Sequence, residues 1–103
     1  MSDIIAERRL CWAHKGDSSR SDFVIRVRAP FVVEPGSVDS PVSEGTGACR
    51  IEFVGFPVAV DETVYGADTV QALQLATNVD PILQRFSDRY DLYFPTGEPS
   101  FEK

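Results

Sequence analysis

The single histidine limits which reactions this sequence can catalyse. An activated nucleophile needs a base within hydrogen-bonding reach, and His14 is the only imidazole available. Cys11 precedes it by three residues. Residues 4–14 alternate like a β-strand, however, and positions three apart in a strand point to opposite faces. We therefore expect an exposed histidine at the end of a strand, and no catalytic dyad.

The two cysteines, Cys11 and Cys49, carry no metal-binding pattern. Neither lies in a Cys-x-x-Cys spacing with a second such pair, as a zinc site would require. The alternation places Cys49 on the inward face of its strand and Cys11 on the outward face of another, so a disulfide bond is not expected. We predict two free thiols, no metal and no cofactor.

Three carboxylates, Asp61, Glu62 and Asp68, form the best candidate acidic site. Paired carboxylates serve hydrolases and bind hard cations, but this spacing is specific to neither. Asp68 also suits a helix N-cap, and a solvated rim is the alternative for the group. Glu62 shares a face with valines and would need a partner if buried, for which Arg8 is the obvious choice. Arg8, Glu62 and Asp68 therefore define a candidate acidic pocket.

Arg26, Arg28 and Arg50 are expected to line up on the solvent face of two neighbouring strands. Nucleic-acid binding would require aromatic side chains between them, and none is evident. Sixteen acidic against ten basic residues give a net charge of −6, which opposes binding to a phosphate backbone. We predict no nucleic-acid partner and a preference for a basic one.

Hydrophobic alternation predicts four strands. Short connections make successive strands neighbours, so the sheet should be an antiparallel meander. In the first strand Arg8 interrupts the apolar face, which suits an edge strand because an inward charge discourages open-ended pairing. The strands are predicted over 4–14, 23–28, 49–53 and 58–65.

The segments between and after these strands are less regular. Residues 31–33 extend the second strand or form a bulge after Pro30. Residues 34–47 are rich in Pro, Gly and Ser and are predicted to be a mobile loop. The aromatic segment 90–95 suits a short strand or a packed tail, and 96–103 a frayed tail.

One long amphipathic helix follows the fourth strand, with Asp68 as its N-cap in an Asp-x-x-Gln capping box. Pro81 lies within the helical pattern, so either the helix bends there or Asp80 caps a second helix. The unbroken periodicity favours the bend. The resulting fold is α+β, a four-stranded sheet with one helix packed on one face, as a single two-layer domain over residues 1–103. The apolar stripe consists of Ala72, Leu75, Ala76, Val79, Ile82, Leu83 and Phe86.

A second, weaker row on the same helix contains Val70, Leu73 and Thr77. The aromatic segment 90–94 is one possible cover for it. The other is a second copy or another protein, for which the row would be a docking surface.

Three segments resemble a family of small bacterial proteins defined only as a domain of unknown function. The resemblance implies a bacterial cytoplasmic origin and a compact, strand-rich domain with one prominent helix. It brings no catalytic residues. The segments are Ile5-Ala6-Glu7-Arg8, YGADTVQALQLA over 65–76 and DLYFP over 91–95.

The sequence contains no apolar run near the roughly 20 residues of a membrane span, and its start lacks a signal-peptide profile. We therefore expect a cytoplasmic protein with no membrane partner. The leading hypothesis is a non-catalytic protein-interaction domain, one version being an immunity or antitoxin protein that binds a basic toxin. The alternatives are a small-molecule-binding protein or enzyme with a pocket between helix and sheet, and a self-associating structural module.

Overall fold

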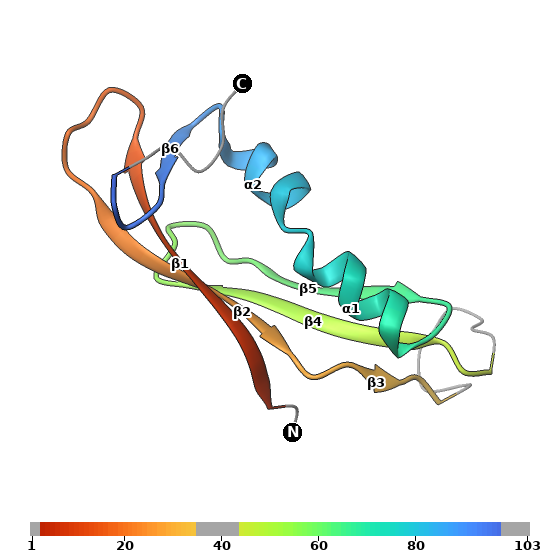
Figure 1. Ribbon diagram of the computed structural model, residues 1–103. Coiled ribbons are helices and arrows are strands. Elements are labelled where there is room, and N and C mark those ends of the chain that lie inside the picture. Colours follow the sequence, from red (N-terminus) through yellow and green to blue (C-terminus); the bar gives the residue numbers. More distant parts are fainter. Residues whose placement is uncertain (1–2, 35–43, 98–103) are drawn as a thin grey trace.

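One antiparallel sheet and two helices make up the part of the chain that the computed structural model describes, residues 3–34 and 44–97 (Figure 1). The predicted mobile loop 34–47 and frayed tail 96–103 lie largely outside these residues. In chain order the elements are β1 (Ile4–His14), β2 (Ser21–Arg28), β3 (Phe31–Val32), β4 (Gly47–Val54), β5 (Asp61–Gly66), α1 (Thr69–Thr77), α2 (Asp80–Phe86) and β6 (Tyr90–Tyr93).

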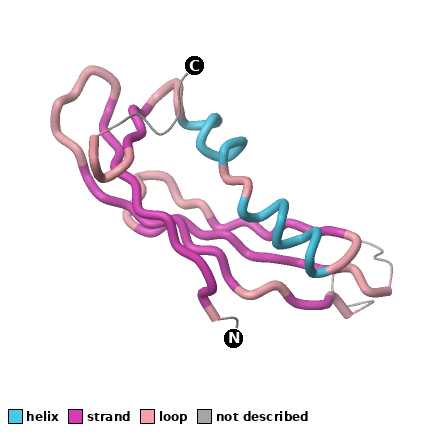
Figure 2. The backbone as a smooth tube through the Cα atoms, in the orientation of Figure 1, coloured by secondary structure: helices cyan, strands magenta, loops and turns pink. Residues whose placement is uncertain are grey.

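The four predicted strands are present as β1, β2, β4 and β5, paired in that order, but the sheet has six strands within residues 3–34 and 44–97 rather than four. Pro30 lacks an amide donor for the ladder, and the chain beyond it pairs separately with β4 as β3. The aromatic segment forms β6 against the other edge of β1. The sheet curls around the helices, so the predicted two layers are only approximate (Figure 2).

The core lies between the curled sheet and the helices. Alternate residues of β2 and β4 face the helices and are buried, as the hydrophobic alternation predicts. Aromatic rings fill the end of the core under α2, where Phe56 contacts Phe86 and Phe23. The fully buried large side chains are Leu10, Phe23, Ile25, Cys49, Ile51 and Leu83.

The helical segment is two helices, so the predicted single bent helix is wrong. Asp68 caps α1 as expected, because its Oδ1 accepts the backbone N–H of Gln71 at 2.8 Å. Asn78 leaves the helical region, with φ −83° and ψ 83°, and α2 begins with Pro81 in its first turn. Proline has no N–H to continue the first helix but suits the start of a new one. The residue that precedes α2 is Val79, not Asp80.

The break changes which residues of α1 face the core. Leu75 was predicted inward but is 50% exposed, whereas Leu73, predicted outward, packs against the core. The predicted stripe assumed one continuous helix from Ala72 to Phe86. Because the chain is not helical at Asn78, α1 can be rotated about its axis independently of α2. The face that α1 buries consists of small residues, Ala72 and Ala76.

Small residues bring α1 very close to the sheet. Gly47 of β4 and Gly66 of β5 lie directly opposite each other beneath the start of the helix. A Cβ atom on Gly66 would lie 2.6 Å from the backbone nitrogen of Ala72, and one on Gly47 would overlap the carbonyl oxygen of Asp68. Only glycine leaves room for the helix backbone at this distance.

We predict that Gly47→Ala lowers the free energy of unfolding by about 2 to 3 kcal/mol, because the added methyl must push the α1 backbone away. Urea unfolding followed by circular dichroism measures this. Gly45→Ala is the matched control. Its Cβ would meet no atom within 4 Å, so only its φ of +87° opposes the change, at about 1 kcal/mol. Equal losses in the two variants would contradict the close approach.

Candidate functional site

The structure separates Cys11 from His14. The Sγ of Cys11 donates to Oδ1 of Asp22 at 3.2 Å. The His14 ring lies beside the rings of Trp12 and Tyr90, with centroids 5.3 and 5.4 Å apart. The two candidate catalytic groups therefore have different partners and form no dyad.

Both thiols are free, as predicted, and the pKa of each is raised. Desolvation raises the pKa of Cys11, and the hydrogen bond to Asp22 and its negative charge raise it further. Burial likewise raises the pKa of Cys49, whose Sγ donates to the carbonyl oxygen of Arg28 at 3.1 Å. Since the thiolate is the reactive form, this environment suppresses nucleophilic chemistry at both cysteines.

We predict that Cys11 reacts more slowly with a thiol-specific reagent at pH 8 than free cysteine does, because its raised pKa lowers the thiolate fraction. Asp22→Asn removes the carboxylate charge, and should speed the reaction several-fold. Peptide mass spectrometry locates the modification at Cys11. An unchanged rate in the variant would show that Asp22 does not hold the proton on the thiol.

The predicted acidic pocket is not assembled. Glu62 pairs with Arg85 of α2, whose Nη2 lies 2.7 Å from both carboxylate oxygens. Asp68 is occupied as the cap of α1. Arg8 lies on β1, separated from β5 by two strands and so by about 14 Å. The expected pair between Arg8 and Glu62 is therefore wrong, and Arg85 takes its place.

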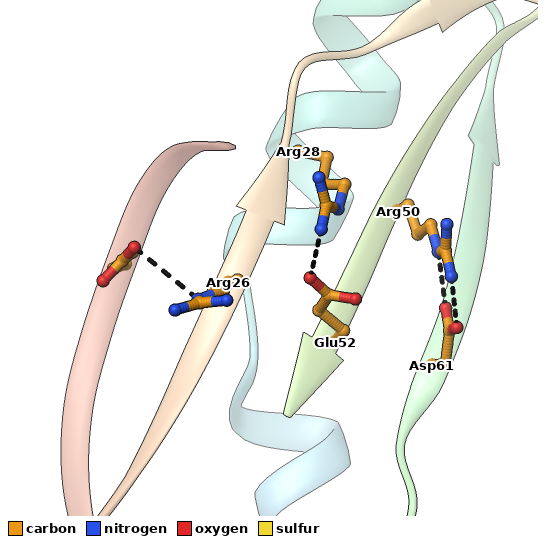
Figure 3. A network of polar contacts seen from close by, with 6 residues as sticks. Arg26, Arg28, Arg50, Glu52 and Asp61 are labelled. Atoms are coloured by element: carbon orange, nitrogen blue, oxygen red, sulfur yellow. Dashed lines mark hydrogen bonds and ion pairs between the residues drawn. The ribbon is translucent and has the colours of Figure 1, made fainter. Parts of the chain in front are cut away.

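The predicted row of arginines is present on the face of the sheet away from the helices, but it is not a basic patch. Each arginine faces a carboxylate on a neighbouring strand (Figure 3). The ion pairs are Arg26 with Glu7 at 3.6 Å, Arg28 with Glu52 at 2.7 Å, and Arg50 with Asp61 through two nitrogens. The strip is thus neutralised, and sequence reasoning missed the carboxylates because they are contributed by three different strands.

We predict that the pair between Arg50 and Asp61 makes stability depend on acid pH. The hydrogen bonds from Arg50 lower the pKa of Asp61, so the folded state favours the charged carboxylate. The charged Asp61 contributes fully to the free energy of unfolding above the pKa of an unfolded aspartate, about 4. This contribution is lost as the pH falls through the lowered pKa of Asp61 in the folded state. Asp61→Asn should therefore unfold at a lower urea concentration than wild type at pH 7, and the difference should shrink in acid.

Arg50→Gln is the control for that experiment, since it keeps the carboxylate but removes the cause of the shift. The pKa of Asp61, measured by NMR titration of its carboxyl group, should return towards the ordinary aspartate value in this variant. An unchanged pKa would contradict the assignment of the shift to Arg50.

The described part of the chain contains neither a cluster of metal ligands nor a helix that could span a membrane. No group of three or more His, Cys, Asp or Glu side chains is close enough there to hold a metal ion. Among the same residues, no helix has both the length and the apolar character to cross a membrane.

Two hollows flank the junction between the helices, where the inner face of the sheet is incompletely covered. The larger, which we call the β5 groove, has a volume of about 410 Å³ and includes Tyr65, Leu75 and Pro81. The smaller, which we call the β1 hollow, has a volume of about 110 Å³ and lies against β1. Its lining residues are Ala6, Glu7, Arg8, Ile25, Val27, Thr77 and Val79.

The three residues of the predicted partner-binding row lie in three different environments. Val70 is 64% exposed, Leu73 packs against the core, and Thr77 lines the β1 hollow. The aromatic segment does not cover the row, because β6 pairs with β1 instead. Leu75, which the sequence pattern placed in the core stripe, is 50% exposed in the β5 groove. Tyr65 borders the groove and is 48% exposed, but its side chain points to the other face of β5, because its neighbour Gly66 faces α1.

Comparisons with protein families, with characterised proteins and with solved structures gave no significant match to this chain. The functional proposal therefore rests on the geometry of the structure.

Proposed function

We propose that this chain is a non-catalytic protein-interaction domain that binds its partner through the β5 groove. The observation that carries the proposal is Leu75, which is 50% exposed in an open, mainly apolar hollow lined also by Ile51, Val64 and Ile82. An exposed large apolar side chain in such a hollow is typical of protein contact surfaces.

The edge of the sheet beside the groove supports the same function. β5 pairs only with β4 among the described strands, so its other edge leaves backbone groups available next to the apolar surface. A partner can therefore combine side-chain burial in the groove with hydrogen bonding to the strand.

The chemistry-bearing side chains also favour binding over catalysis. Glu62, the charged residue of the β5 groove, is already paired with Arg85. The raised pKa values of Cys11 and Cys49 disfavour the reactive thiolate form. A groove with no free acid, base or nucleophile among its described residues suits a contact surface better than a reaction site.

The net charge of −6 favours a basic partner by speeding its approach. Free thiols fit a reducing cytoplasm. An immunity or antitoxin protein that neutralises a basic bacterial toxin is one form of this function, suggested by the small size and the acidic charge of the chain.

We expect affinity-tagged protein to recover a basic partner from the source cell, and Leu75→Arg to weaken that complex about 30-fold by placing a charge in the groove. Val54→Arg is the matched control, since Val54 is also exposed but belongs to β4 outside the groove. Titration calorimetry with the purified partner compares the two variants. Equal weakening, or a protein that remains a monomer without any partner, would count against the function.

A further inference from the structure

The outer edge of β1 is the longest unpaired strand edge in the described structure. β6 pairs with β1 only over Cys11–His14, which leaves the first seven residues of β1 with β2 on one side alone (Figure 1). At about 3.3 Å per residue this open edge is roughly 23 Å long. It presents a row of backbone N–H and C=O groups, which is the template that an added strand requires.

The side chains along this edge form a specific pattern. Ala6 and Arg8 lie opposite Val27 and Ile25 of the core, so they share the inner face with the β1 hollow. Ala6 is small and leaves space beside it. Arg8 is exposed, and no carboxylate among the described residues pairs with it. The edge therefore offers one apolar space and one free cation, two residues apart.

A second copy of the chain is a poor occupant of this edge. Antiparallel pairing centred on Arg8 would place two arginines opposite each other, and pairing centred on Glu7 would do the same with two glutamates. Like charges directly opposite destabilise strand pairing. Pairing centred on Ala6 would run across the bulge between Ile4 and Ala6, where the register shifts.

We propose that the open edge of β1 binds an extended peptide segment of another protein by strand addition. The segment carries a carboxylate opposite Arg8 and a large apolar side chain opposite Ala6. Arg8 sets the specificity, because an apolar side chain in that position would desolvate the cation without pairing it. This surface is separate from the β5 groove, and the proposal does not depend on the groove's function.

A synthetic seven-residue peptide of β-branched residues tests the proposal. It has glutamate at its third position and leucine at its fifth, and a second peptide has lysine in place of the glutamate. Each is titrated into isotopically labelled protein while the amide chemical shifts are followed. We expect the glutamate peptide to shift the amides of residues 4–10, and Arg8→Glu to weaken its binding at least tenfold. The lysine peptide should then bind Arg8→Glu better than wild type.

Two matched variants show whether the effect is specific to Arg8 and to the edge of β1. Arg9→Glu makes the same change in net charge on the opposite face of β1, and should weaken the glutamate peptide less than Arg8→Glu does. Leu75→Arg should bind the peptide like wild type, so failure at the β5 groove and failure at β1 can be told apart.

The proposal is overturned if neither peptide shifts residues 4–10, or if exchanging the charge at position 8 leaves the preference between the peptides unchanged. A concentration-dependent dimer that protects the same amides without any peptide would also overturn it, in favour of a second copy. Circular dichroism of each variant confirms that the exposed substitutions leave the fold intact.

Discussion

The close approach of α1 to β4 and β5 fixes the layout of this domain. Gly47 and Gly66 remove two side chains from the sheet at one point, and the backbone at Asp68 and Ala72 occupies that space. α1 therefore packs chiefly on β4 and β5, at one side of the curled sheet. The inner face near the start of β1 is left with only the helix junction beside it, and both flanking hollows follow from this placement.

Ion pairs in the described structure mostly link neighbouring elements of the fold. On the face away from the helices, three arginines alternate with carboxylates from neighbouring strands (Figure 3). On the helix side, Arg85 ties α2 to Glu62 of β5. Exposed pairs of this kind each add little stability, but they neutralise charge that would otherwise define a binding site. Arg8, at the uncovered edge of β1, stands outside these pairs, and this is the basis for proposing that it selects a partner.

The parts of the fold that could be predicted are those set by local pattern. Alternation located β2 and β4 with their buried faces, and the capping residue located the start of α1 at Asp68. The rotation of α1 could not be read in this way, because it depends on the glycine pair in the sheet rather than on its own apolar residues. Leu75 and Leu73 exchanged their expected environments for that reason.

The candidate site was less predictable than the fold, because its residues meet across strands. The partner of Glu62 is 23 residues away, on a helix whose separate existence depends on the break before Pro81. The ion pair between Arg50 and Asp61 is a diagonal contact that requires the β4–β5 register, which places Asp61 opposite Glu52, and no single strand pattern reveals that register. The prediction that β1 is an edge strand holds only for its first seven residues, where Arg8 lies, because β6 pairs with the rest of β1 over Cys11–His14.

Nuclear Overhauser effects at the two glycines test the close approach most directly. A Cβ on Gly47 would lie 2.5 Å from the backbone nitrogen of Thr69, so the Gly47 α-proton that takes that position must be near the Thr69 amide proton. The account predicts strong effects between these protons and between the Gly66 α-protons and the amide of Ala72. If both effects were missing while the rest of the β4–β5 ladder was observed, α1 would not be seated on the glycine pair and this layout would be wrong.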